Sequence, residues 1–270
     1  MRLFRVNLRK LLRRPATWVT ALLLIGLLLL IMLAIVAASR QTADAESALA
    51  SKLFVSFPGA WTLMLTVVLG IGGLLALTYG AAIAGSEWTW GTLKAAVARG
   101  ESRSRYTLMG FAGVAVFTWL ILLAAYLVGI VASMVGATLT GVSLSGIGDG
   151  ATLGRMPDLF ARAALGTAME AGFGFAVATV ARSQLAGIGV GIGLYFAEGI
   201  AGIFVPDVIR WFPFAAASAL ITGAPTGGAA GSGGVVHRLD PNTAALATAA
   251  WLVASLVIAA AWTERAEISG

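Results

Sequence analysis

Six long apolar blocks constrain the fold of this chain more than any other feature of its sequence. They run over about residues 18–38, 60–84, 107–138, 159–181, 185–205 and 243–262. A helix of about 20 apolar residues crosses a bilayer core about 30 Å thick, and it pairs its own backbone polar groups. Only 11% of the residues are charged, which is too few for the surface of a soluble domain. The pattern predicts one all-α integral membrane domain over residues 1–270, with six transmembrane helices.

The basic residues indicate which way the chain is oriented. If the N-terminus lies in the cytoplasm, the inner segments hold twelve of the 18 Lys and Arg residues, and the outer segments hold Arg40, Lys52, Arg155, Arg162, Arg210 and Arg238. Lys and Arg are in excess on the cytoplasmic side of membrane proteins, so both termini are predicted to be cytoplasmic. The same distribution explains the net charge of +6 without a nucleic-acid partner.

Residues 1–16 are predicted to form an amphipathic helix ahead of the first span. Basic residues recur through this segment with no acid among them, beside apolar residues that include Leu8, Leu11 and Leu12. Such a helix suits the anionic inner surface of a bilayer. The apolar run that follows is about twice the 7–15 residues of a signal-peptide core, so we interpret it as a span. The Ala, Gly and Arg content is typical of a bacterium with a GC-rich genome. We expect no signal peptide and no long outer domain, which favours the plasma (inner) membrane.

The segment from Ser86 to Gly100 is too polar to span and is predicted to form a short cytoplasmic helix. Ser86 suits the N-cap, Glu87 suits the positive end of the helix dipole, and Gly100 suits the left-handed position after the helix. One face of that helix would carry Trp90, Leu93 and Val97. This helix either lies at the membrane surface, anchored by tryptophans, or docks a soluble partner.

The motif Glu87-x-x-x-Gly91-Thr92-Leu93-Lys94, preceded by two predicted helices and followed by a basic patch, resembles the permease subunits of ABC transporters of the ABC-2 type. The likeness extends to the basic N-terminal helix, the six spans, the tight turn at 182–184 and the segment 213–220, which in the family forms an outer re-entrant hairpin. It implies a cytoplasmic coupling helix between the second and third spans. The ATPase-coupling residues would be Glu87, Trp88, Trp90, Gly91, Thr92, Leu93, Lys94, Arg99 and Arg103.

The resemblance also implies the partners of the chain. Two ABC ATPase subunits would bind beneath the coupling helix, and a second permease chain, identical or homologous, would complete the pathway of an exporter. ATP and magnesium would be bound by the ATPases. The sequence has no Gly-x-x-x-x-Gly-Lys-[Ser/Thr] phosphate loop, so we expect neither a cofactor nor enzymatic activity in this chain.

Two acids fall inside the predicted spans, Glu170 in the fourth and Glu198 in the fifth. Acids within a span face protein or a water-filled cavity. They therefore either line the substrate route or bind a proton, or they form hydrogen bonds within the bundle. The single histidine, His237, is not expected to bind a metal, because the chain has no cysteine to share such a site. Residues 223–234 are interpreted as a linker.

Two other functions remain open from the sequence. A stand-alone secondary transporter or channel would work without ATP and would depend on Glu170. A non-transporting scaffold or immunity protein would tolerate substitution of Glu87 and Gly91. A membrane-embedded enzyme has no catalytic group of residues in the sequence to support it.

Overall fold

The structure is a computed structural model that describes residues 2–41, 52, 54–221 and 238–266. Every regular element in these ranges is a helix. The six helices that are long and apolar enough to cross a membrane are α2 (Pro15–Gln41), α4 (Gly59–Thr89), α6 (Arg103–Thr140), α7 (Gly150–Ala181), α8 (Gln184–Phe204) and α11 (Pro241–Arg265). The prediction of an all-α chain with six candidate spans is confirmed, as expected of a multi-pass membrane protein.

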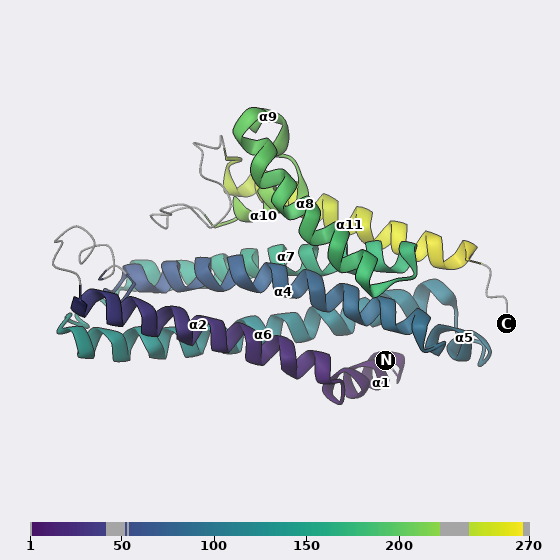
Figure 1. The fold of residues 1–270 in the computed structure, drawn as a ribbon, viewed down its shortest axis with the longest axis horizontal. Helices are drawn as coiled ribbons and strands as arrows, with labels where there is room; N and C mark the ends of the chain where they lie inside the picture. The colour runs from purple at the N-terminus through teal and green to yellow at the C-terminus, as the bar shows by residue number, and fades with distance from the viewer. Residues whose placement is uncertain (1, 42–51, 53, 222–237, 267–270) are drawn as a thin grey trace.

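The long helices form three layers (Figure 1). The central layer consists of α4 and α7, which pack along each other; α2 and α6 lie on one side of it, and α8 and α11 lie on the other. The main apolar cluster lies where these layers meet and includes Met64, Leu65, Leu122, Met169 and Leu220. Most of α7 is buried, whereas only a minority of the residues of α2, α8 and α11 are, as expected of helices that border lipid.

The contact between α4 and α7 depends on glycine. A Cβ atom on Gly80 would overlap the carbonyl oxygen of Ala171, and a Cβ atom on Gly174 would overlap the carbonyl oxygen of Leu77. The two backbones therefore meet with no side chain between them, the arrangement that small residues permit in membrane helices. This contact consequently leaves no room for a larger residue at Gly80 or Gly174.

The glycines of α8 divide between its two faces. Gly187 lies against Ala178 of α7, and Gly191 lies against Leu77 of α4, whereas Gly189 and Gly193 have no atom within 4 Å of the position of a Cβ. Alternate glycines of the series therefore allow close helix packing, and the others do not face a neighbouring helix.

Several segments that carry the family resemblance lie at one end of the bundle. This end contains α1 (Arg2–Leu12), α5 (Thr92–Val97), the turn between α7 and α8 and the end of α11. At the turn, Arg182 adopts φ 51° after the last residue of α7. Ser183 then caps α8 by accepting a hydrogen bond from the backbone N–H of Ala186 at 3.3 Å. This is the tight connection predicted at 182–184.

The opposite end differs from the prediction in one respect. The fourth span was predicted to begin at about residue 159, but α7 begins at Gly150 and contains Pro157. Asp149 starts the helix because its carboxylate accepts the backbone N–H of Thr152 at 2.8 Å. Pro157 removes one backbone hydrogen bond from the helix. The helix nevertheless continues, because the rest of α7 is packed on its neighbours.

The segment before α11 forms two short helices, α9 (Pro206–Ile209) and α10 (Pro213–Ser218). Phe214, Ala216 and Ala217 of α10 are buried, where the helix packs against α7 and α11. The predicted linker at 223–234 and His237 lie outside the described residues.

Candidate functional site

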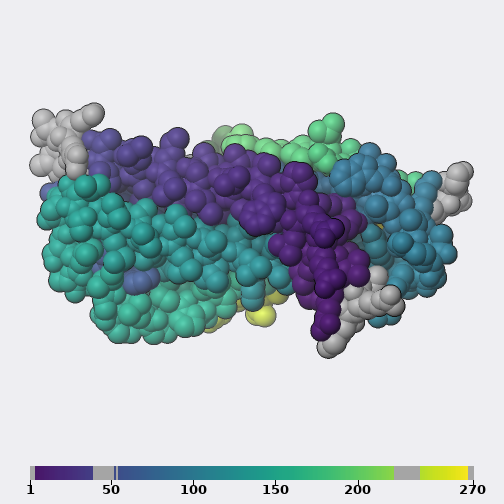
Figure 2. All heavy atoms as spheres, turned by 90° about the horizontal axis from the view of Figure 1, so that it is seen from below, coloured from purple at the N-terminus to yellow at the C-terminus, as the bar shows by residue number. Residues whose placement is uncertain are grey.

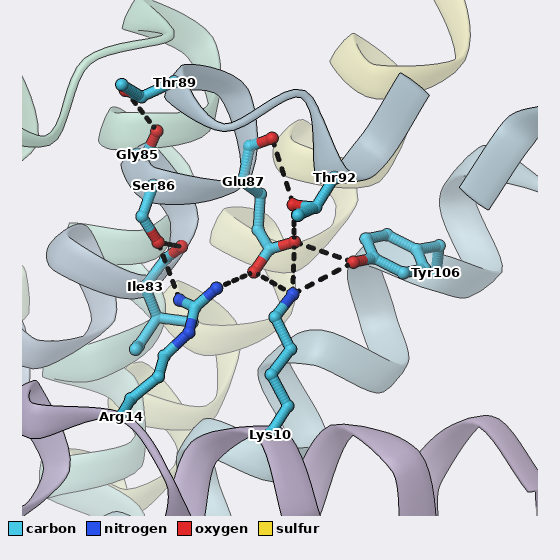
Figure 3. Close-up of polar contacts among 9 residues, drawn as sticks. All are labelled: Lys10, Arg14, Ile83, Gly85, Ser86, Glu87, Thr89, Thr92 and Tyr106. Carbon is cyan, nitrogen blue, oxygen red and sulfur yellow. Dashed lines mark hydrogen bonds and ion pairs between the residues drawn. The ribbon is translucent and has the colours of Figure 1, made fainter. Parts of the chain in front are cut away.

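The helix α1 lies across the end of the bundle and packs on α6. Figure 2 shows it in dark purple beside the blue segment formed by the end of α4 and by α5. Asn7 and Leu11 are buried on its inner face, and both lie against the backbone of Gly113 on α6. Lys10 and Arg14 extend from this side of the chain toward α4 (Figure 3).

Glu87, in the last turn of α4, is the centre of a polar cluster (Figure 3). Its carboxylate accepts hydrogen bonds from Lys10 Nζ at 2.6 and 2.8 Å, from Arg14 Nη2 at 2.8 Å and from the hydroxyl of Tyr106 at 2.7 Å. The hydroxyl of Thr92 also donates to it. One carboxylate therefore connects α1, the turn before α2, α4, α5 and α6.

The cluster is largely shielded from solvent, so its charges depend on each other. The side chains of Glu87 and Arg14 are 15% and 8% exposed. Burial lowers the pKa of Lys10, and the charge of Glu87 opposes that shift. Removing one partner from a buried ion pair costs far more than an exposed pair contributes. Glu87 is therefore a strong structural link between α1 and the bundle.

The predicted helix from Ser86 to Arg99 is wrong in its bounds. Ser86 is not an N-cap: it lies within α4, buried, where its hydroxyl accepts a hydrogen bond from Arg14 Nη1 at 2.7 Å. The helix α4 continues to Thr89, and the break comes at Gly91, whose φ of 63° places it in the left-handed region that glycine adopts without strain. The apolar residues before Ser86 form a continuous helix, and α4 extends through Ser86 although serine is a common N-cap residue.

The helix α5 presents one buried and one exposed face. Leu93 and Ala96 are buried, whereas Ala98 and Arg99 are exposed, and Lys94 is exposed on the same short helix. Gly100, at φ 85°, holds the left-handed position predicted for it. One side of α5 and the turn after it are therefore accessible at the surface of the chain.

The two tryptophans of the motif precede the break and contact arginines. Trp90 is 64% exposed, and the Arg14 guanidinium lies 4.9 Å from its ring centre. The predicted apolar face shared by Trp90, Leu93 and Val97 is therefore wrong, because the helix breaks at Gly91. The Arg182 guanidinium lies 4.9 Å from the ring of Trp88, so a cation–π contact links the α7–α8 turn to the end of α4.

Arg103 acts at a different place from Glu87. Its Nη1 donates to the carbonyl oxygens of Glu264 at 3.1 Å and Ala266 at 2.8 Å. The Glu264 carboxylate in turn accepts the backbone N–H of Ser104 at 3.0 Å. These bonds hold the start of α6 against the end of α11. Arg103 therefore stabilises the fold at this contact.

Sequence reasoning missed three members of the Glu87 cluster, namely Lys10, Arg14 and Tyr106. The basic residues were interpreted as topology signals. Two features of the sequence could have indicated this pairing. Lys10 and Arg14 are four residues apart in the acid-free segment before the first span, and Glu87 is one of the few acids at the inner ends of the spans.

The two acids within the spans lie within electrostatic range of each other. Glu198 on α8 accepts the backbone N–H groups of Phe214 and Ala215 at 3.0 and 2.8 Å. Glu170 on α7 lies against Gly73 of α4. Among the described residues, no group of three or more His, Cys, Asp or Glu side chains could hold a metal ion.

Comparison with known proteins adds no family to these observations. No protein-family model matches the chain, and no curated protein matches its sequence.

Proposed function

We propose that this chain is the permease subunit of an ATP-driven exporter of the ABC-2 type. It would form the translocation pathway with a second permease chain, identical or homologous, and would be driven by two separate ATPase subunits. Both termini would lie in the cytoplasm of a bacterium, with the chain in its inner membrane. The proposal rests on the resemblance carried by Glu87, Gly91, Thr92, Leu93 and Lys94, and on the geometry around them.

The observation that supports this proposal most is the way in which α5 is attached. Its outer face is exposed, and the hydroxyl of Thr92 at its start donates to Glu87. Glu87 is in turn bound to Lys10 of α1 and to Tyr106 of α6. A partner that displaced α5 would therefore displace α1 and the ends of two long helices with it. An ATPase needs such a connection to transmit its motion to the spans.

The exposed face of α1 supports an interfacial position for it. Arg5, Arg9 and Arg13 recur at four-residue intervals on this face, beside exposed Val6 and Leu12. Cationic side chains next to apolar ones suit the boundary between lipid headgroups and acyl chains. In the same proposal, the buried α10 and the α9 that precedes it form the re-entrant segment on the outer side.

A pull-down from native membranes tests the function. We expect an ATPase subunit to co-purify with the wild-type protein in mild detergent, and its yield to fall at least about tenfold, which corresponds to 1.4 kcal/mol, in Arg99→Glu. Arg155→Glu is the matched control, because Arg155 is an exposed arginine on α7 near the opposite end of the bundle. Recovery of no ATPase with the wild type, or equal loss with both variants, would contradict the proposal.

A secondary transporter is the second candidate, and the buried pair Glu170 and Glu198 is the observation that favours it. Acids held inside a bundle of spanning helices often mark ion pathways. Transport by the purified chain in ATP-free vesicles, abolished by Glu170→Gln, would favour this function over the first.

A further inference from the structure

Two glutamates lie deep in the bundle, outside the Glu87 cluster. Glu170 on α7 is 6% exposed and Glu198 on α8 is 4% exposed. They are close enough for the charge of Glu198 to act on Glu170. Two carboxylates buried together would repel each other strongly in a medium of low dielectric constant. The surroundings of the two groups show how this repulsion is avoided.

Glu198 has hydrogen-bond donors at one of its two oxygens, whereas its Oε1 is buried without a partner among the described residues. Its Oε2 accepts two backbone N–H groups, those of Phe214 at 3.0 Å and Ala215 at 2.8 Å. Both belong to the first turn of α10, where Pro213 has no N–H to donate. Hydrogen bonds to a charged acceptor are about twice as strong as neutral ones, so these two donors favour the ionised form of Glu198.

Glu170 lacks such backbone donors in the part of the chain that the structure describes. Its Oε2 is buried and has no hydrogen-bond partner among the described residues. That carboxyl fills the space beside Gly73 of α4, where any Cβ would overlap it. Within the same part of the chain, the groups in electrostatic contact with Glu170 are Glu198 and Tyr195, both from α8, and neither supplies a positive charge. An ionised carboxylate without a donor or a cation is costly in such a place.

We propose that Glu170 and Glu198 form an intramembrane proton-binding site, in which Glu170 carries the proton and α10 holds the negative charge on Glu198. Release of the proton from the Glu170 carboxyl to water would leave two adjacent carboxylates. Their repulsion would act between α7, which carries Glu170, and the unit of α8 and α10. Proton binding therefore holds α8 and α10 against α7, and this inference is independent of any ATPase.

Infrared spectroscopy of the full-length protein at neutral pH tests the assignment. We expect the wild type to show a protonated-carboxyl C=O band that is lost in Glu170→Gln and retained in Glu198→Gln. Loss of the band in Glu198→Gln alone would overturn the assignment of the proton. A wild type with no such band would overturn the site itself, because both acids would then be ionised and would need a bound cation.

Thermal unfolding in detergent gives a second readout. Glutamine has the size and neutrality of a protonated glutamate, so Glu170→Gln is expected to leave the melting temperature unchanged. Glu198→Gln weakens two charge-assisted hydrogen bonds and is expected to lower it by about 3 °C or more. If Glu170→Gln were the more damaging of the two, or failed to fold, Glu170 would be the ionised member and the proposal would be wrong.

Discussion

Gly80→Leu is expected to prevent the bundle from assembling. The new side chain would begin where the carbonyl oxygen of Ala171 lies, and a backbone atom in the centre of a helix cannot turn away as a side chain does. Overpacking in a core costs about 1–3 kcal/mol when side chains can adjust. Here α4 and α7 must separate, so we expect a loss above the upper end of that range, seen as the absence of a monodisperse peak in size-exclusion chromatography in detergent.

Gly70→Leu provides the matched control for this substitution. Gly70 lies on the same helix, and no atom lies within 4 Å of the position of its Cβ. The same leucine there should leave the elution profile and the melting temperature close to those of the wild type. Equal damage from both substitutions would show that α4 and α7 do not meet through Gly80.

Glu87→Leu is expected to cost about 3–5 kcal/mol, the range found when one member of a buried ion pair is removed. Lys10 and Arg14 would lose the anion that both contact in the wild type, and α1 would lose its connection to α4. The check is the melting temperature in detergent, together with protease cleavage within the first 14 residues, which should become faster when α1 is released.

Two further variants separate charge from side-chain volume in this cluster. Glu87→Gln keeps one acceptor oxygen and should lose less than Glu87→Leu. Combining Glu87→Leu with Lys10→Met and Arg14→Met should recover much of the stability, because no unpaired charge then remains. A Glu87→Leu protein as stable as the wild type would refute the structural role assigned to this carboxylate.

The spanning helices could be predicted because their signal is a sum over about 20 residues. Individual errors in helix ends, such as the start of α7 before Pro157, do not change that sum. Local breaks were harder to place. Ser86 had the chemistry of an N-cap, yet it lies inside α4, since an apolar helix that is already formed continues through such a residue. The helix is interrupted at Gly91, which has a positive φ. In the sequence this glycine was interpreted only as one position of the motif.

The contacts within the candidate site depended on the tertiary fold. Glu87 and the short connection around it could be located from residue types close together in sequence. Its partners Lys10 and Tyr106 are 77 and 19 residues away, and nothing local selects them from the other basic and aromatic residues. The different surroundings of Glu170 and Glu198 could not be read from the sequence either, because the α10 backbone supplies the donors to Glu198.

Photo-cross-linking from position 98 tests the proposed function most directly. A photoreactive amino acid replaces Ala98, which is exposed just after α5, and cells are irradiated before the membranes are isolated and the products are identified by mass spectrometry. The same amino acid at Ala151, exposed at the start of α7 near the other end of the bundle, is the control. Our account predicts a cross-link from position 98, and none from position 151, to a protein with an ATP-binding phosphate loop. A cross-link to lipid alone, or to the same proteins from both positions, would contradict it.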